Sequence, residues 1–415
     1  MDSTASSRFE QPERRFELPF GVEPVQCVAV AYAAWLFGLS FVFHLAPDNK
    51  ILLEIALIAG MIPAMLHCLL LPIDTRGNGP GMWFLWAFMV IFLLSYLVNS
   101  FDWEDLANLA NVMFVFMLGI LIASTTDTSL IMRIVGVYAL MMIPFLVYIN
   151  MTGERVWGRL HAGAQPNVWG LFSLNVAIGA FALKNRILQG ICMVVVMMTM
   201  YNAQTRGSMV ALMPTLVIFA HQFYAYDKKL DITWKMIATY AAVMVVFGFV
   251  AFHSDVLIND VLRLHDPQRG LDSGATGRDQ TWREALHIWF RSPLLGVGFR
   301  KHEEFMVYTE MSAHNAYIAM LADTGFVGFI AYMCFLIGSL VRAFSVKEDK
   351  LRLFLIGLII SYALAGLFER RAINVGNSFS ISYIFCCLIA LRLSRLQQLE
   401  RKVSADPPGV PALGP

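Results

Sequence analysis

Residues 314–328 read His-Asn-Ala-Tyr-Ile-Ala-Met-Leu-Ala-Asp-Thr-Gly-Phe-Val-Gly and change from polar to apolar along their length. His314 and Asn315 open a helix-like run, and Gly325 and Gly328 mark the point at which it meets a long apolar segment. That segment is long enough to cross a bilayer. The stretch therefore predicts a helix that enters a membrane and carries a titratable imidazole at the membrane edge.

The composition predicts a polytopic membrane protein. The chain has 415 residues, of which 58% are hydrophobic and 15% charged, and its mean hydropathy is +0.61. The hydrophobic fraction exceeds that of ordinary soluble domains, and the charged fraction is lower. Repeated apolar runs of about 18–22 residues are each long enough to span the hydrocarbon core, which favours one helical bundle. We therefore expect an all-α fold of about twelve transmembrane helices, near residues 25–45, 51–72, 82–99, 106–124, 129–149, 168–183, 187–201, 207–224, 233–253, 325–342, 351–367 and 377–396.

The distribution of lysine sets the predicted orientation. With the N-terminus inside, seven of the nine lysines fall on the cytoplasmic side, and only Lys50 and Lys301 lie outside. This asymmetry follows the positive-inside rule. The expected divisions are a cytoplasmic tail at 1–24, nine spans at 25–253, a long outer loop at 254–313, an outer helix with three more spans at 314–396, and a disordered cytoplasmic tail at 397–415.

The outer side keeps arginine although it lacks lysine. Arg159 follows the fifth predicted span, Arg206 lies in a very short connection before the eighth, and Arg278 lies in the long loop. A guanidinium presents a planar fork of donors that fits phosphate oxygens. The pattern favours a phosphorylated ligand in a partly dry site. The alternative for any single arginine is a contact with phospholipid headgroups.

The long outer loop contains one predicted helix. Its apolar residues at 282, 285, 286 and 289 have the spacing of one helical face, which would lie at the membrane interface or pack on the bundle. Thr276 is the expected N-cap and puts Arg278 in the first turn. A cation is disfavoured there unless an anion is nearby, which favours a ligand for Arg278.

His314 combines with these arginines into a minimal catalytic set. By itself, a histidine at a membrane edge is usually an interfacial residue hydrated by water. Near neutral pH an imidazole can also take a proton from a hydroxyl without a metal. Arginines can neutralise a departing pyrophosphate, and one such donor contributes about 3–4 kcal/mol. The sequence shows no metal-ligand cluster, phosphate-cradling glycine loop or nucleic-acid patch, so no cofactor is expected.

A family signature coincides with this stretch. The pattern His, then Asn, Ser or Gln, nine residues, Gly, two residues, Gly resembles that of bacterial O-antigen ligases, and His314, Asn315, Gly325 and Gly328 match every fixed position. The twelve spans and the single long loop are similar too. These ligases belong to a superfamily with O-antigen polymerases and protein O-oligosaccharyltransferases. The resemblance implies a fold similar to that of C-type membrane glycosyltransferases.

The resemblance also implies a reaction: transfer of a glycan from undecaprenyl pyrophosphate to a hydroxyl of the lipid A core, at the periplasmic face of the inner membrane. By that likeness, His314 activates the acceptor, while Arg206 and Arg278 hold the pyrophosphate. Arg159 and Asn167 lie in a Gly/Pro/Asn segment that is seen across the superfamily. No metal, nucleotide or nucleic acid is implied. With no carboxylate nucleophile visible, the expected course is a single inverting displacement.

The remaining residues of the motif have expected supporting roles, and other functions stay open. Asn315 and Tyr317 support His314, whereas Gly325 and Gly328 are structural points of close packing or bending. An O-antigen polymerase or a protein O-oligosaccharyltransferase is the first alternative. A flippase or transporter is more remote, because its ionisable residues would gather near the bilayer midplane and its halves would be related.

Overall fold

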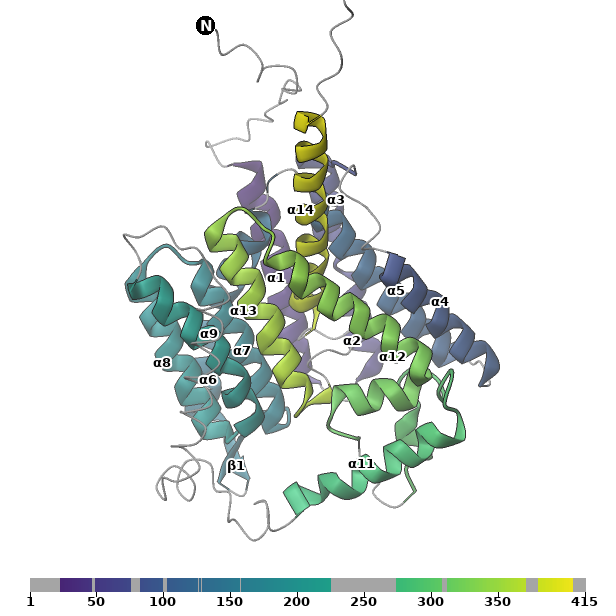
Figure 1. Ribbon diagram of the computed structural model, residues 1–415. Helices are drawn as coiled ribbons and strands as arrows, with labels where there is room; N and C mark the ends of the chain where they lie inside the picture. The colour runs from purple at the N-terminus through teal and green to yellow at the C-terminus, as the bar shows by residue number, and fades with distance from the viewer. Residues whose placement is uncertain are drawn as a thin grey trace, which may run out of the picture.

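The computed structural model describes residues 23–46, 49–75, 83–99, 103–125, 127, 129–156, 158–224, 274–307, 312–370 and 380–405. Most of these residues are helical (Figure 1). The helices are α1 Pro24–Leu45, α2 Lys50–Ile58, α3 Met61–Leu70, α4 Trp83–Val98, α5 Trp103–Ala123, α6 Leu130–Thr152, α7 Pro166–Ala182, α8 Arg186–Ala203, α9 Arg206–Tyr224, α11 Gly274–Arg291, α12 Ala316–Ala343, α13 Asp349–Gly366 and α14 Ile381–Ala405, with a short 3-10 helix at His302–Phe305.

Asparagine fixes where three of the helices begin. The side chain of Asn49 accepts from Leu52 N at 3.0 Å before α2, and Asn185 accepts from Ile187 N at 2.8 Å before α8. Asn315 plays the same part before α12. Each oxygen satisfies a backbone N–H that the first helical turn leaves without a partner. Local sequence therefore sets the register of α12, the helix that follows His314.

The protein is an all-α membrane protein with several membrane-crossing helices, although the predicted total of twelve stays a prediction. Within the described ranges, six helices are long and apolar enough to cross a bilayer, and all six fall on predicted spans. Three other predicted spans correspond to shorter apolar helices, and the predicted span at 233–253 lies outside the described residues. The six are Pro24–Leu45, Lys50–Leu70, Leu106–Ala123, Leu130–Thr152, Arg186–Ala203 and Ala316–Ala343.

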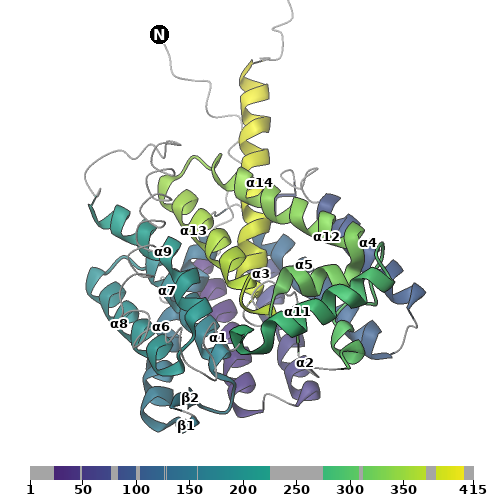
Figure 2. The ribbon, with the colours of Figure 1, turned by 60° about the horizontal axis from the view of Figure 1, so that its bottom comes forward.

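A small β-hairpin, which the sequence did not predict, connects two of the helices. Strands β1 Glu154–Val156 and β2 Arg159–His161 pair antiparallel between α6 and α7. Gly158 in the connection has φ 74°, a left-handed value that glycine adopts without strain. Three-residue strands are too short for an alternating pattern to reveal them. The hairpin carries Arg159 to the same end of the bundle as α11 (Figures 1 and 2).

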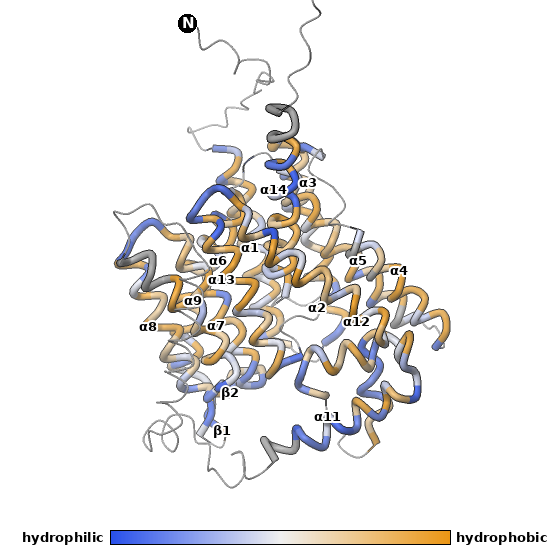
Figure 3. The backbone as a smooth tube through the Cα atoms, in the orientation of Figure 1, coloured by the Kyte–Doolittle hydropathy of each residue, from blue (hydrophilic) through white to orange (hydrophobic). Residues whose placement is uncertain are grey.

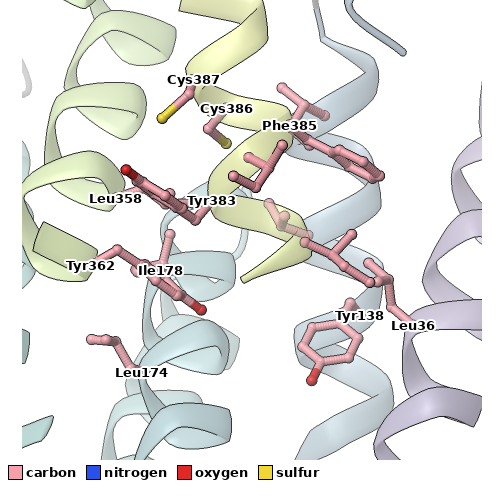
Figure 4. Packing of buried hydrophobic residues seen from close by; sticks show 14 of the residues in the cluster. Leu36, Tyr138, Leu174, Ile178, Leu358, Tyr362, Tyr383, Phe385, Cys386 and Cys387 are labelled. Atoms are coloured by element: carbon pink, nitrogen blue, oxygen red, sulfur yellow. The ribbon is translucent and has the colours of Figure 1, made fainter. Parts of the chain in front are cut away.

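The core is built around α14. Its residues from Ile381 to Ala390 are almost completely buried against α5, α12 and α13. The ring of Tyr383 stacks on Tyr362 of α13 with centroids 5.4 Å apart (Figure 4). The Tyr383 hydroxyl lies 3.2 Å from that of Tyr332 on α12. Figure 3 shows apolar residues along the bundle helices, with polar residues in the hairpin, in α11 and at the ends of the bundle helices. This packing fixes the end of α13, where the candidate site lies.

Helix α12 is broken at Gly325. This residue has φ 65° and ψ −172°, so the helix bends between its parts at 316–324 and 326–343 (Figure 1). Groups freed by the break bond to the loop after α11: Phe326 N donates to Pro293 O at 2.8 Å, and Gly298 N donates to Asp323 O at 2.9 Å. A Cβ at Gly325 would lie 2.3 Å from backbone atoms of Leu294. Glycine thus allows both the bend and the close approach of the loop.

Candidate active site

A short segment after α13 gathers the ends of three other helices. Residues 367–369, which we call the hub segment, follow directly on α13. Leu367 O accepts from Asn315 Nδ2 at 3.2 Å, next to the start of α12. Phe368 packs so tightly on Gly207 of α9 that a Cβ there would lie 2.4 Å from the Phe368 Cβ. Glu369 Oε2 accepts from Asn167 Nδ2 of α7 at 3.1 Å. The N-termini of α7, α9 and α12 therefore meet at this segment.

Arg159 is joined to the hub segment through Asn167. Its Nη2 donates to Asn167 Oδ1 at 3.2 Å, while its Nε donates to Ala203 O at 3.0 Å. The Asn167 amide thus accepts from a guanidinium at its oxygen and donates to a carboxylate at its nitrogen. The result is a polar chain that runs from Arg159 of the hairpin through Asn167 to Glu369.

His314 faces Glu369 across an open gap. The distance from His314 Nδ1 to Glu369 Oε2 is 3.8 Å, which is too long for a hydrogen bond. The side chains are 29% and 13% exposed, respectively. Nδ1 itself is buried and, within the described part of the chain, makes no hydrogen bond. His314 also has φ 48°, a strained left-handed backbone for a residue other than glycine. The imidazole thus lies close to the Glu369 carboxylate but is not hydrogen-bonded to it.

Arg278 approaches the same carboxylate from α11. Burial lowers the pKa of its guanidinium, and the nearby Glu369 carboxylate partly offsets this by raising it. Helix α11 begins at Gly274, so Thr276 lies within the helix and the prediction of Thr276 as N-cap is wrong. The helix packs on α12 through Ala285 and Ile288. The sequence had left open whether this helical face would pack on the bundle or lie at the membrane interface. Packing on α12 brings Arg278 within electrostatic range of Glu369.

The other predicted residues lie around this centre. Arg206 begins α9 and adjoins Gly207, which touches Phe368. Asn315 caps α12, accepting from Tyr317 N at 2.9 Å, and Tyr317 Oη donates to Ala363 O of α13 at 2.7 Å. The capping and the tyrosine contact together fix the backbone on the C-terminal side of His314.

Gly328 lies one turn beyond the break in α12. A Cβ there would lie 2.4 Å from side-chain atoms of Thr324, so a larger residue would press on the turn that carries the break. Gly325 and Gly328 contact backbone and packing atoms, and their role is in the shape of α12.

Sequence reasoning missed Glu369. The sequence showed no carboxylate nucleophile, whereas the structure places the Glu369 carboxylate next to His314 and Asn167. The available signal was an acidic residue directly before Arg370 and Arg371 at the end of a predicted span. Arg370 itself is turned to the 3-10 helix, where its Nη1 pairs with Glu303 Oε1 at 2.6 Å. Within the described residues, no group of three His, Cys, Asp or Glu is placed to hold a metal ion.

Comparison with known families adds a second line of evidence. Residues 191–333, about a third of the chain, match the family model described as O-antigen ligase. The chain carries an O-antigen ligase domain. This match supports the O-antigen ligase/polymerase superfamily, whose members are glycosyltransferase-like enzymes with lipid-linked glycan substrates. No curated protein matches the chain.

The matched region separates the site residues into two groups. The O-antigen ligase domain includes Arg206, Arg278 and the whole stretch from His314 to Gly328. Arg159 and Glu369 lie outside it, on elements that precede and follow the domain. The site is thus completed by parts of the chain that the family match does not reach.

Proposed function

We propose that this protein is an O-antigen ligase, which transfers a polysaccharide from undecaprenyl pyrophosphate to a hydroxyl of the lipid A core without a metal. The observation that carries the proposal is the position of His314 and Asn167 on either side of Glu369, with Arg278 within electrostatic range of that carboxylate. Arg159 joins them through Asn167. The family match supports a glycosyltransferase, and this arrangement supports a charged donor and a histidine base.

The hub segment suits a pyrophosphate. The N-termini of α7, α9 and α12 contact it, and a helix N-terminus carries partial positive charge. Such termini are common anion sites. The guanidiniums of Arg159, Arg206 and Arg278 are added to them. In this proposal, these groups bind the donor pyrophosphate and stabilise the charge that grows on it as it leaves.

His314 is the proposed general base. Its Nδ1 faces Glu369, which leaves Nε2 as the nitrogen for the acceptor. The acceptor hydroxyl oxygen attacks the anomeric carbon while the bond from that carbon to the pyrophosphate oxygen breaks. The hydroxyl proton passes to His314 Nε2, and undecaprenyl pyrophosphate departs as the anion. One displacement inverts the configuration of the anomeric carbon. Glu369 does not attack in this scheme, since it is engaged with Asn167.

The distribution of charge supports a periplasmic position for the site. Lys184, Arg186 and Lys350 lie close enough to influence one another, at the end of α7 and the beginnings of α8 and α13. These are the helix ends opposite the hub segment. By the positive-inside rule, they mark the cytoplasmic side of the inner membrane. The hub segment, the hairpin and α11 then face the periplasm.

A reconstituted transfer assay tests the proposed function. Purified protein in detergent receives a glycan linked to undecaprenyl pyrophosphate together with lipid A-core, and product is followed by gel and mass spectrometry. Arg278→Ala should lower the transfer rate by about 10²-fold or more. Arg291→Ala is the matched control, because Arg291 lies exposed at the other end of α11. Equal rates for both variants would overturn the assigned role of Arg278.

The acceptor decides between the ligase and its relatives. The same assay is run with a second lipid-linked glycan, and then with a protein, in place of lipid A-core. A ligase gives product with lipid A-core alone. Elongated lipid-linked glycan would make the protein a polymerase, and glycosylated protein would make it an oligosaccharyltransferase. Product formed in detergent needs no second compartment, so it would also exclude obligatory transport.

A further inference from the structure

Glu369 puts a negative charge where the proposed donor needs positive charge. It belongs to the hub segment, which contacts three helix N-termini, and its own carboxylate accepts from Asn167 at 3.1 Å. The guanidinium of Arg278 is electrostatically coupled to it. These are the groups to which the proposed function assigns the pyrophosphate. A carboxylate in that position offers acceptor oxygens to the same donors that a phosphate would use.

His314 shows the complementary feature. Its Nδ1 is buried, has no hydrogen-bond partner within the described residues, and lies 3.8 Å from Glu369 Oε2. A small movement of the carboxylate would close that gap into a hydrogen bond. The closed pair would fix the ring orientation and make Nε2 a better proton acceptor, as a carboxylate does for a neighbouring histidine. Glu369 thus lies between two sets of groups, with Asn167 and Arg278 in one set and His314 in the other.

We propose that Glu369 is an internal counter-ion that stands in for the donor pyrophosphate and becomes the positioning residue of His314 when the donor binds. This inference rests on the proposed function. Phosphate oxygens displace the carboxylate from the arginine side, and Glu369 closes on His314 Nδ1–H. The base is thereby oriented only after the leaving group is in place. Glu369 forms no covalent bond, and no proton leaves it.

The proposal makes an unusual prediction for Glu369→Gln. Glutamine keeps the size of the side chain and can still accept from Asn167, but it carries no charge to compete with a phosphate. Inorganic pyrophosphate should therefore bind the purified variant about tenfold more tightly than it binds the wild type. The maximal transfer rate should nevertheless fall, because a neutral amide cannot support the imidazolium. A purely structural Glu369 would give weaker or unchanged pyrophosphate binding.

The experiment measures binding of inorganic pyrophosphate by calorimetry to the purified full-length wild type, Glu369→Gln and Arg278→Ala. Failure of the proposed function is recognised separately: the wild type would not bind pyrophosphate, or Arg278→Ala would bind it equally well. If the wild type binds, Arg278→Ala weakens binding and Glu369→Gln does not tighten it, the counter-ion role is wrong.

Glu369→Asp keeps the test decisive should the glutamine variant fail to fold. Aspartate retains the charge but is shorter by one methylene, so pyrophosphate affinity should stay within about twofold of the wild type. The maximal transfer rate should fall, because the shorter carboxylate reaches His314 poorly. Tightening of pyrophosphate binding by this charge-conserving change would overturn the proposal.

Discussion

Two histidine–carboxylate pairs lie near the N-terminal part of α12, and they differ in the distance between their side chains and in their exposure to solvent. His302 Nδ1 lies 2.8 Å from Asp323 Oδ1, and these side chains are 0% and 4% exposed. His314 Nδ1 lies 3.8 Å from Glu369 Oε2, and these side chains are 29% and 13% exposed. The first pair is closed and sealed by packing. The second is open and can be reached from solvent.

The difference separates a structural role from a chemical one. Asp323 Oδ1 also accepts from the backbone N of His302 at 2.9 Å, so the closed pair joins the 3-10 helix to α12. No substrate can reach a ring that is 0% exposed. The open pair has atoms that solvent can reach, as a site awaiting a ligand should. A ring nitrogen without a hydrogen bond does not separate the pairs, since within the described residues His302 Nε2 and His314 Nδ1 both lack one. Residue types alone would have given the two pairs equal standing.

The largest predicted effect concerns the open pair. His314→Ala removes the proposed base and should lower the transfer rate by about 10²- to 10⁴-fold. The midpoint of thermal unfolding should change little, because the ring has no hydrogen bond at Nδ1 to lose. Rate and unfolding midpoint are measured on the same purified sample. A rate within tenfold of the wild type would remove the chemical distinction between the pairs.

The closed pair should respond in the opposite way. Asp323→Ala leaves the buried His302 ring and its backbone N–H without their acceptor, and should lower the free energy of unfolding by about 3 kcal/mol. The transfer rate per folded molecule should be retained. Asp279→Ala is the control, since this aspartate is exposed on α11 and should change stability by about 0.5 kcal/mol or less. Loss of activity in stable, folded Asp323→Ala would show that the closed pair also takes part in the chemistry.

The break in α12 lies two residues after Asp323 of the closed pair, and Gly325 provides the next test. Gly325→Ala forces φ 65° on a residue with a Cβ and drives that atom against Leu294, so it should cost about 2–3 kcal/mol of stability. Gly338→Ala is matched in chemistry on the same helix, but its Cβ meets nothing within 4 Å. This control should be neutral or stabilising by up to about 1 kcal/mol. Equal unfolding midpoints for the two variants would mean that the break is not a fixed feature.

The sequence predicted what depends on local patterns. Apolar runs located the long membrane-crossing helices, and the polar start of residues 314–328 located the beginning of α12. The two three-residue strands were missed because they are shorter than any reliable alternation. Glu369 was missed for another reason. It lies 55 residues after His314 in the chain. The two residues come together because the beginning of α12 lies next to the end of α13.

Arginine was the easier signal to read and also the easier one to overinterpret. Counting outer arginines favoured a phosphate ligand, yet Arg370 is committed to Glu303 at 2.6 Å. Arg159 and Arg278 reach the hub segment by different routes, one through Asn167 and one through α11. Sequence alone gives the number of such charges on one side of a membrane. Their partners are set by tertiary packing, which no spacing rule in this chain revealed.

The smallest predicted effect separates two arginines of the hairpin. Arg159 donates to Asn167 Oδ1 at 3.2 Å and so supports the amide that holds Glu369 in its open position. Arg159→Ala should lower the transfer rate about tenfold, the loss expected for one hydrogen bond from a charged group. Arg155 lies on β1, is exposed, and reaches only Asn202 Oδ1 at 3.4 Å. Arg155→Ala should change the rate less than about twofold. Donor titrations on both variants give the comparison, and an equal loss from the two would mean that the hairpin acts through its overall charge, without a specific path from Arg159 to the open pair.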